Sequence, residues 1–513
     1  MDHAETQTEA LAFLNSLPSD DPARPDVVRI DTHANIVFLV GSKAYKVKRA
    51  VTFPFLDYST LALREEACKA EITVNQANAP QVYRRALAIT RHRDGSLALD
   101  GTGEPVEWAV EMNRFERRGE LDILAKTTEF SNDLCDKLSK MMVDAHANAP
   151  LRKGGDFFAE LTSYIEQNDT AFREHPDLFP PDDVQHLTLA SRTALSSVHD
   201  LILRRGDMGF VRRCHGDAHL RNIVLIEDAL VLFDAVEFSD AIATNDVLYD
   251  LAFLLMDLWE RGQQTAANRV FNRYLDLSDL PEQLEGLAAL PFYMMMRAAI
   301  RSKIAAASAL NQADPVTKEH QQNQAKEYFG YALAFLEPTP TKLIAVGGLS
   351  GTGKTTLAYG LAPDVGRAPG ARVLRTDVKR KRLLGLSETE KAPQSAYTQE
   401  ASDKVYQAID SDIQTVLAAG HSAIFDAVFA SEDERAAIET IAARVESEFH
   451  GIWLDADPDT LKSRVAARSG DASDATTEIV DRQLTYDLGT LSWETIDADG
   501  PAPITLERAK SVI

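Results

Sequence analysis

The sequence predicts two domains of different fold class: an α+β domain of two lobes, followed by an α/β domain with a parallel sheet flanked by helices. Strand-like segments come first in the chain, and helical patterns take over between residues 120 and 335. A proline-spaced tetrapeptide, Pro338–Thr341, then precedes a new apolar strand at 343–346 and a glycine-rich loop. The predicted bounds are residues 1–337 for the first domain, with a small lobe at about 25–112 and a large lobe at about 113–337, and residues 338–513 for the second.

Length and composition agree with two globular domains. A chain of 513 residues is too long for one ordinary core, and 45% hydrophobic with 26% charged residues is typical of folded proteins. The net charge of −24 argues against general binding to nucleic acid or anionic membranes, because phosphate contacts need a basic surface. Three widely spaced cysteines predict neither a disulfide framework nor a zinc site.

The N-terminus and the apolar segments bear on the location of the protein. The first residues are acidic and lack the basic, then apolar, pattern of a secretory signal. No apolar stretch approaches the about 20 residues that a membrane-spanning helix needs. We expect a cytoplasmic protein that acts on small molecules and binds neither nucleic acid nor membranes.

The small lobe begins with three strand-like segments, at residues 27–30, 36–40 and 44–48. Strict alternation in the third segment places Lys46 and Lys48 on the same face of the strand. Two further segments complete the lobe, a helix at 60–77 and a strand at 108–112. Four residues recur on one stripe of that helix: Arg64, Cys68, Glu71 and Asn75.

The first chemical motif is a loop, His215–Asn222, followed by an acid at the end of the next strand, Asp234. The carboxylate of Asp217 is suited to accept the proton of an attacking alcohol. The amide oxygen of Asn222 and the carboxylate of Asp234 are ligands that Mg²⁺ prefers. These three roles are those of phosphoryl transfer from ATP to a hydroxyl.

A lysine on an upstream strand is also needed, to neutralise the phosphates of ATP, and Lys46 supplies it in an Ala-x-Lys arrangement. A carboxylate on the following helix should hold this lysine. We choose Glu71, because it lies on the stripe described above, while Glu65 and Glu66 stay open as alternatives.

This part of the chain resembles the aminoglycoside phosphotransferase (choline-kinase-like) family, a branch of the protein-kinase fold. The resemblance spans about residues 25–335 and includes Lys46, the hinge-like Glu111–Phe115, His215–Asn222 and Asp234. It implies that ATP is held between two lobes, with Glu111 and Met112 at the nucleotide. In place of a glycine-rich loop, the turn at His33–Asn35 must cover the phosphates.

The second motif, Gly348–Thr355, satisfies the P-loop pattern GxxxxGK[ST] between a predicted strand and a predicted helix. Backbone N–H groups converge on the phosphates there, Lys354 reaches the β- and γ-phosphates, and Thr355 is a Mg²⁺ ligand. The predicted nucleotide-binding residues are Gly348, Ser350, Gly351, Thr352, Gly353, Lys354, Thr355 and Thr356.

Charged residues follow three further predicted strands. A strand at 373–377 ends in Asp377, at the sheet edge where ligands gather in open α/β sheets, and a strand at 423–426 ends in Asp426. Arg464 and Arg468 lie four residues apart on a helix after the strand at 452–455, where they clamp a transferring phosphoryl group or form a solvated basic face. Two arginines follow Asp377 and are predicted to bind an anionic substrate: Arg380 and Arg382.

Residues 341–500 resemble the P-loop kinases that include zeta toxins, chloramphenicol phosphotransferase and gluconate- or shikimate-kinase-like enzymes. The resemblance implies that Asp377 is the base or the ligand of the acceptor hydroxyl, and that Asp426 is a Walker-B-like metal carboxylate. It implies that Arg464 and Arg468 lie on a mobile lid. Asp377 as a carboxylate that orders the metal is the alternative.

Two complete phosphate-handling motifs predict a bifunctional phosphotransferase that uses ATP and Mg²⁺ and transfers the γ-phosphate to hydroxyls of small molecules. A different class of function stays open, a regulator in which the P-loop ATPase gates the kinase-like domain or a partner protein. Antibiotic resistance and a toxin-like role have the support of family names alone.

Overall fold

The computed structural model describes residues 3–53, 56–310, 312–467 and 472–513. The chain forms two compact units, each built from separate segments. Unit 1 consists of residues 1–130, 140–161 and 202–257, and unit 2 consists of residues 131–139, 162–201 and 258–513. The predicted boundary at 338–341 lies inside unit 2, so the domain bounds drawn from the sequence stay a prediction.

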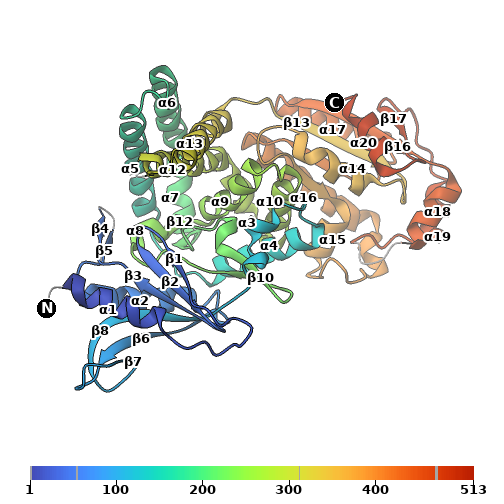
Figure 1. Cartoon of the computed structure of the whole chain (residues 1–513). Coiled ribbons are helices and arrows are strands. Elements are labelled where there is room, and N and C mark those ends of the chain that lie inside the picture. The colour runs from blue at the N-terminus through green and yellow to red at the C-terminus, as the bar shows by residue number, and fades with distance from the viewer. Residues whose placement is uncertain (1–2, 54–55, 311, 468–471) are drawn as a thin grey trace. The chain divides into compact units, whose positions relative to one another are not determined.

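Unit 1 begins with a six-stranded antiparallel sheet in the order β1-β2-β3-β8-β6-β7 (Figure 1, blue). Alternation of buried residues gives the sheet two apolar faces. Helix α1 packs on one face through Ala10 and Leu14, and helix α2 packs on the other through Cys68. The bounds are β1 Val28–Asp31, β2 Asn35–Val40, β3 Lys43–Lys48, β6 Tyr83–Arg91, β7 Leu97–Leu99, β8 Glu104–Asn113, α1 His3–Asn15 and α2 Leu61–Asn75, with a short hairpin of β4 Thr52–Phe53 and β5 Leu56–Asp57.

The rest of unit 1 is a helical part with short strands that carry the first motif. The loop after β9 (Val211–Arg213) holds His215–Asp217, and the hairpin of β10 and β11 separates Asn222 from Asp234. Ile223 pairs with Leu232 in that hairpin, so Asn222 and Phe233 lie side by side at its open end. The other elements are η1 Arg117–Gly119, α3 Leu121–Leu124, η2 Leu220–Asn222, β10 Ile223–Ile226, β11 Ala229–Leu232, α8 Asp240–Ala243, β12 Thr244–Asp246 and most of α9 Val247–Glu260.

An apolar cluster joins the sheet to this helical part within unit 1. It contains Ala44, Val110 and Met112 from the sheet and Val224 and Val231 from the hairpin. The cluster lies on the face of the sheet that α2 also covers. The antiparallel sheet and the helices confirm the predicted α+β class of the first part.

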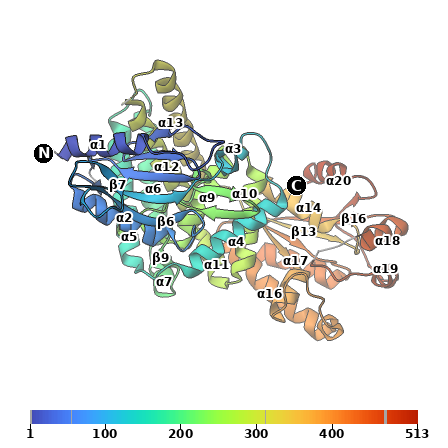
Figure 2. The same ribbon diagram turned by 60° about the horizontal axis from the view of Figure 1, so that its bottom comes forward.

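Unit 2 contains a five-stranded parallel sheet in the order β14-β15-β13-β16-β17. Helices α14 and α20 lie on one side of it and α16 and α17 on the other (Figure 2). The parallel sheet confirms the predicted α/β class. The bounds are β13 Lys342–Gly348, β14 Arg372–Arg375, β15 Ala423–Asp426, β16 Glu448–Asp455, β17 Glu494–Asp497, α14 Lys354–Leu361, α15 Thr376–Leu383, α16 Gln399–Ala418, α17 Glu432–Arg444, α18 Pro458–Ala467, α19 Thr477–Gln483 and α20 Ala502–Lys510.

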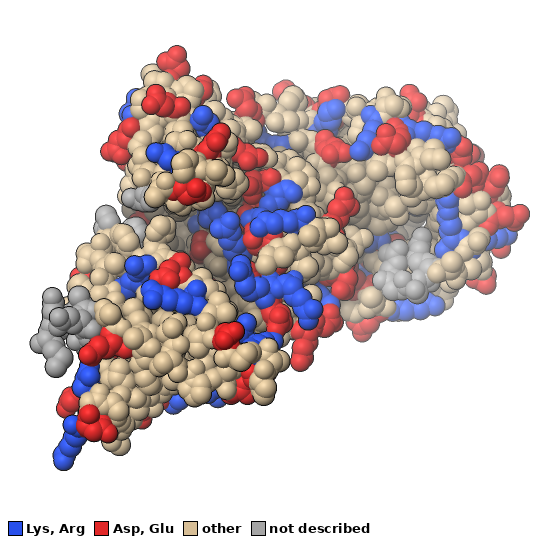
Figure 3. Space-filling view, viewed as in Figure 1, with Lys and Arg blue, Asp and Glu red and all other residues tan. Residues whose placement is uncertain are grey.

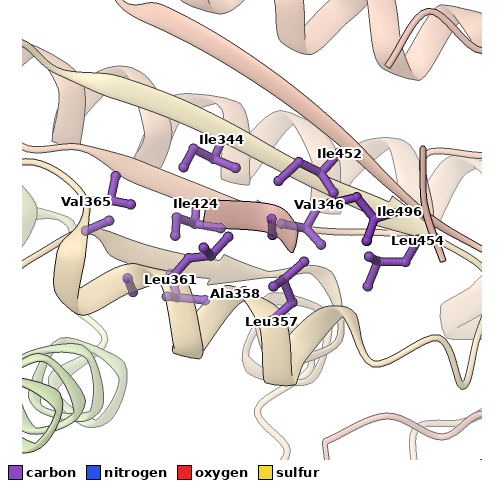
Figure 4. Packing of buried hydrophobic residues seen from close by; sticks show 14 of the residues in the cluster. Ile344, Val346, Leu357, Ala358, Leu361, Val365, Ile424, Ile452, Leu454 and Ile496 are labelled. Carbon is purple, nitrogen blue, oxygen red and sulfur yellow. The ribbon is translucent and has the colours of Figure 1, made fainter. Parts of the chain in front are cut away.

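The core beneath α14 fixes the start of the P-loop. Ile344 and Val346 of β13 pack against Leu357 and Leu361 of α14, all of them at most 3% exposed (Figure 4). The strand before the loop and the helix after it are therefore both anchored by buried apolar side chains. The two ends of the glycine-rich turn are fixed in position as a result.

Unit 2 also contains helices from the part of the chain before residue 338. Helices α12 and α13 pack extensively against each other, and α10 and α11 precede them. The bounds are α6 Pro181–Ser197, α10 Gln264–Ser278, α11 Pro281–Gly286, η3 Leu287–Ala289, α12 Leu290–Leu310 and α13 Pro315–Leu336. Helices α4 Asn132–Asn148, α5 Gly154–Arg173 and α7 His199–Asp207 contribute residues to both units.

The surface and the helices bear on membrane association. On the face shown in Figure 3, acidic and basic side chains are interspersed. Within the described ranges, the helices are too short or too polar to span a bilayer.

Candidate active sites

The structure brings Lys46 together with two of the acids predicted from the sequence. Its Nζ lies 2.8 Å from Oε1 of Glu71 on α2 and 2.5 Å from Oδ1 of Asp234, in the loop after β11. The four residues of the predicted stripe are the buried residues of α2, so periodicity placed Glu71 correctly on the face toward the sheet. Lys46 thus joins the sheet, helix α2 and the loop after β11.

A second lysine and a second acid, which the motif did not include, extend this network. Nζ of Lys48 lies 2.5 Å from Oε2 of Glu71 and also pairs with Glu237, which accepts a hydrogen bond of 3.0 Å from the hydroxyl of Tyr58. Glu71 and Lys48 are fully buried. The signal for Lys48 was present in the alternation of the strand, whereas the sequence carried none for Glu237.

Electrostatics of the network favour its charged form. Burial opposes ionisation of Glu71, but the ammonium groups of Lys46 and Lys48 outweigh burial and lower the pKa of Glu71 to about 2. Burial likewise opposes protonation of Lys48, and Glu71 and Glu237 outweigh it, so that the pKa of Lys48 lies above its ordinary value. The shifts of Glu71 and Lys48 both favour the charged form, so this buried ion pair stays ionised at physiological pH.

Asp217 and Asn222, in the loop of the first motif, are in direct contact. Nδ2 of Asn222 donates to Oδ2 of Asp217 over 2.9 Å and to its carbonyl oxygen over 3.0 Å, and Nε2 of His219 lies 3.3 Å from Oδ2. The Asp217 side chain is 40% exposed, so a hydroxyl can reach it from solvent. Asn222 itself is buried, because η2 holds it against the loop.

Buried polar groups brace the loop from behind. Nδ1 of His215 accepts from the N–H of Asp217, so Nε2 carries the proton and donates to the carbonyl of Phe233 over 2.9 Å. Burial lowers the pKa of His215 and keeps its ring neutral in this role. Asp250 accepts the N–H of Gly216 over 2.9 Å, and Asp257 accepts that of Leu220 over 2.9 Å.

Asp234 occupies a backbone conformation that costs energy. Its φ of 63° is left-handed, which is rare for a residue other than glycine. Its N–H donates to the hydroxyl oxygen of Tyr83 over 3.2 Å, and the N–H of Ala235 donates to Oδ1 of Asn75 over 2.8 Å. The sheet and α2 therefore hold this strained turn, and 43% of the Asp234 side chain stays exposed. Its carboxylate and the amide of Asn222 fit the oxygen-ligand preference of Mg²⁺.

The register of the sheet separates the two predicted hinge residues. Met112 pairs with Ala44 and lies on the same face of the sheet as Lys46, in the apolar cluster. Glu111 pairs with Tyr45 on the opposite face, where Arg85 and Lys43 bind its carboxylate at 2.8 and 3.1 Å. The side chain of Glu111 thus points away from Lys46, and the binding of nucleotide by Glu111 and Met112 stays a prediction.

The P-loop joins β13 to α14 in the predicted geometry. Gly348, Gly351 and Gly353 have positive φ values of 139°, 93° and 92°, and α14 begins at Lys354 without a side-chain cap. Nζ of Lys354 donates to the carbonyl of Leu349 over 2.9 Å, folding back over the loop. Uncapped N–H groups at a helix start and a lysine over the loop form an anion site. The other predicted residues lie in or beside this turn: Ser350, whose N–H donates to Gln483 over 2.8 Å, buried Thr352, and exposed Thr356.

A hydroxyl and a carboxylate meet beside the loop. Oγ1 of Thr355 donates to Oδ2 of Asp426 over 2.6 Å, and Nε of Arg375 lies 3.5 Å from the same oxygen. These oxygen atoms fit Mg²⁺. Asp377 lies in the first turn of α15 instead of at a strand end, because β14 already ends at Arg375. Burial raises the pKa of Asp377, and the nearby carboxylate of Asp426 adds to this effect.

The four predicted arginines lie in different surroundings. Arg380 donates to the carbonyl of Ala396 over 2.7 Å, and its guanidinium stacks on Tyr397 at 4.9 Å. Arg382 lines a cavity of about 220 Å³ with Lys379, on another face of α15, and binds acids there. Arg464 donates to the carbonyl of Gly500 over 3.0 Å. Arg468 lies outside the described residues, so its pairing with Arg464 stays a prediction.

The close approach of α18 to the P-loop gives a test of this geometry. A Cβ at Gly351 would lie 2.6 Å from the carbonyl oxygen of Leu461, whereas a Cβ at Gly353 would meet nothing within 4 Å. Both positions have nearly the same φ, so the left-handed strain of about 1–2 kcal/mol is common to Gly351→Ala and Gly353→Ala. We expect Gly351→Ala to destabilise the protein by about 1–3 kcal/mol more, measured by thermal unfolding without nucleotide. Equal melting temperatures for the two variants would contradict this contact.

The P-loop part of the chain matches a protein-family model. Residues 343–486 match the family model described as an AAA domain (AAA_33). This match and the parallel sheet around the loop confirm the predicted P-loop fold.

Two mycobacterial proteins are similar to the chain along most of its length. "Uncharacterized protein Rv2004c" of Mycobacterium tuberculosis and "Uncharacterized protein Mb2027c" of Mycobacterium bovis are each 29% identical to it over 485 residues. The similarity covers 92% of this chain and 92% of each relative. Both parts of the chain therefore occur together in these relatives.

Solved structures of kinases are similar to separate parts of the chain. A choline/ethanolamine kinase family protein of Mesorhizobium loti is 14% identical, covering 64% of this chain and 99% of its own, with a TM-score of 0.37. A sugar kinase of Janibacter sp. is 23% identical, covering 34% of this chain and 94% of its own, with a TM-score of 0.27. Both TM-scores are low, so the fold rests on the sheets and contacts described above.

The fold and the two sites define an enzyme of the phosphotransferase class. A lysine–glutamate pair contacts Asp234 in unit 1, and a P-loop residue, Thr355, contacts Asp426 at a strand end in unit 2. Within this class, the chain is one whose residues 343–486 match the AAA domain (AAA_33) model.

Proposed function

We propose that the protein is a bifunctional phosphotransferase that uses ATP and Mg²⁺ at two sites and transfers the γ-phosphate to hydroxyl groups of small molecules. The observation that carries this proposal is that each site has its own lysine, acid and pair of oxygen ligands. The first set is Lys46, Asp217, Asn222 and Asp234, and the second is Lys354, Asp377, Thr355 and Asp426. Neither site needs a residue of the other.

At the first site, Glu71 orients the ammonium of Lys46 for the phosphates of ATP. Asp217 accepts the proton of the acceptor hydroxyl. The oxygen of that hydroxyl bonds to the γ-phosphorus as the bond to ADP breaks and ADP leaves. Asn222 and Asp234 would hold Mg²⁺, which neutralises charge on the phosphates when bound. The contact of Asn222 with Asp217 keeps the carboxylate in place for the hydroxyl.

At the second site, the N–H groups of the P-loop and Lys354 bind the β- and γ-phosphates. Thr355 and Asp426 would hold the metal ion. Asp377 accepts the proton of the acceptor hydroxyl, and the raised pKa of this carboxyl makes it a better base than an exposed carboxylate.

Lysine replacement at each site tests the proposal. Release of ADP is measured over a panel of sugars, nucleosides and amino alcohols, and two acceptor-dependent activities are expected. Lys46→Met should abolish one of them and Lys354→Met the other, because each lysine stabilises phosphate charge at its own site. The exposed lysines Lys140 and Lys404 provide the controls Lys140→Met and Lys404→Met, which should change neither activity. A folded protein without acceptor-dependent ADP release would contradict the proposal.

A second candidate, a regulator in which the P-loop site gates the first site, has one supporting observation. Helix α9 carries Asp250 and Asp257, which hold the first catalytic loop, and α10 begins four residues after α9 ends. Helix α10 binds the P-loop sheet, as described below. Under this candidate, Lys354→Met changes turnover at the first site and does not abolish a separate reaction at the P-loop site.

A further inference from the structure

Helix α10 presents a stripe of buried polar residues to the P-loop sheet within unit 2. Asn268, Asn272 and Asp276 recur every four residues on one face of the helix, and they are 1%, 0% and 5% exposed. Buried amides and carboxylates are costly unless they are hydrogen-bonded. The hydrogen-bond and ion-pair partners of these three residues therefore show which part of the fold the helix supports.

The two asparagines bind the edge strand β14 and the residues directly before it. Nδ2 of Asn268 donates to the carbonyls of Pro369 and Ala371 over 3.0 and 3.1 Å. Asn272 accepts the N–H of Val373 over 2.8 Å through Oδ1 and donates to the carbonyl of Ala371 over 3.1 Å through Nδ2. An edge strand exposes unpaired N–H and C=O groups, and here helix side chains pair with them. Strand β14 is thus held on its open side by α10.

Asp276 binds both ends of the segment that carries the second-site acid. Its Oδ1 lies 2.7 Å from a guanidinium nitrogen of Arg372, at the start of β14, and 3.1 Å from one of Arg382, in the last turn of α15. Between these arginines, the chain passes Arg375, which contacts Asp426, and Asp377. One carboxylate therefore fixes the start and the end of the β14–α15 segment.

Two further contacts of α10 reach other parts of the P-loop fold. Nη1 of Arg273 lies 2.8 Å from Oε1 of Glu388, in the loop after α15. The guanidinium of Arg269 lies 5.0 Å from the ring centre of Tyr359 on α14, the helix that begins at the P-loop lysine. The helix contacts β14, the loop after α15, and α14, so it is packed against the P-loop fold along its length.

We propose that Asp276 and Asn272 of α10 are positioning residues for the second active site, which fix the β14–α15 segment so that Asp377 faces the acceptor hydroxyl. The proposal rests on the proposed function in taking Asp377 as the proton acceptor. The physical reason is that β14 is an edge strand with neighbours on one side, so its position depends on what holds its other side. Residues 338–513 alone would lack this support.

Asp276→Asn in the full-length protein tests the proposal. The change keeps the shape of the side chain and removes the charge that binds Arg372 and Arg382. Asp279→Asn is the matched control, because Asp279 lies one turn further on, is half exposed, and contacts Arg382 at 3.5 Å. We expect kcat at the second site to fall about 10–100-fold in Asp276→Asn, since small misplacements of catalytic groups have effects of this size. The Kd for ATP, measured by direct binding, should change less than about threefold, because the P-loop itself is intact.

A second readout separates this proposal from the proposed function. Amide hydrogen exchange over residues 376–383 should be faster in Asp276→Asn than in Asp279→Asn, well below the melting temperature, whether or not an acceptor is known. Asp276→Glu should restore part of the lost kcat. If Asp276→Asn does not fold, Arg382→Gln breaks the link between Asp276 and α15 while leaving Arg372 paired, and it should show the same faster exchange and lower kcat. A lower melting temperature with unchanged kcat and unchanged exchange in 376–383 would overturn the proposal, because that result indicates a structural role only.

Discussion

Replacing Asp217 by asparagine should lower turnover at the first site by about 10²–10⁴-fold, the range expected for loss of a general base. The amide has nearly the size of the carboxylate, so the contact with Asn222 constrains it in the same place. What is lost is the ability to take the proton of the acceptor hydroxyl. Initial rates of ADP release with the best acceptor of the first site measure the effect.

The control for this change is Asp228→Asn, in the exposed turn of the β10–β11 hairpin that follows Asn222. It should leave both activities and the melting temperature unchanged. Asp217→Asn should also keep its melting temperature and its turnover at the second site. A loss of less than tenfold at the first site would mean that another group accepts the proton, and parallel loss at both sites would favour the regulatory coupling.

Local patterns in the sequence were sufficient for much of both sites. The stripe Arg64, Cys68, Glu71 and Asn75 was visible as a helical period, and these residues are the ones that α2 buries. The alternation around Lys46 gave the face of β3, and the P-loop pattern gave the turn between β13 and α14. Such features succeed because the backbone period of one element determines them.

Features that depend on register or on distant contacts were not accessible in the same way. Glu111 was predicted at the nucleotide from its place in the hinge-like segment, and pairing with Tyr45 turns its side chain to the face opposite Lys46. Asp377 was expected at a strand end, and the structure has it one residue inside α15, because the strand ends early. Arg382 was expected to face a substrate, and one of its acidic partners, Asp276, lies on α10, about 100 residues earlier in the chain.

The contacts of α10 show that the domain boundary, too, depends on distant contacts that the sequence does not reveal. Pro338–Thr341 interrupts the helical pattern, so it marks a change in the local chain, and sequence reasoning placed a domain boundary there. The contacts of Asn268, Asn272 and Asp276 cross that point. A buried asparagine gives no sequence signal of its partner, because any of several backbone groups satisfies it equally.

Replacing Glu71 by glutamine should have the largest effect on stability. Glu71 is fully buried between the ammonium groups of Lys46 and Lys48, at 2.8 and 2.5 Å. Without its charge, these two buried lysines keep Asp234 and Glu237 as acidic partners among the described residues. Removing one partner from a buried ion pair costs about 3–5 kcal/mol of the free energy of unfolding, and we expect a loss in this range. Urea denaturation at pH 7 measures it.

Glu65→Gln is the matched control, since Glu65 lies on the same helix and was one of the two alternative partners for Lys46. Its carboxylate instead pairs with Lys69 on the helix surface at 2.5 Å, and an exposed pair of this kind contributes less than about 1 kcal/mol.

The effect of Glu71→Gln should also depend on pH. Because the folded state lowers the pKa of Glu71 to about 2, the stabilisation is fully present above the ordinary glutamate pKa and is lost as the pH falls toward 2. The difference between wild type and Glu71→Gln should therefore be constant between pH 6 and 8 and should narrow below about pH 4. A cost equal to that of Glu65→Gln, or one independent of pH, would mean that the charge of Glu71 does not hold the two lysines.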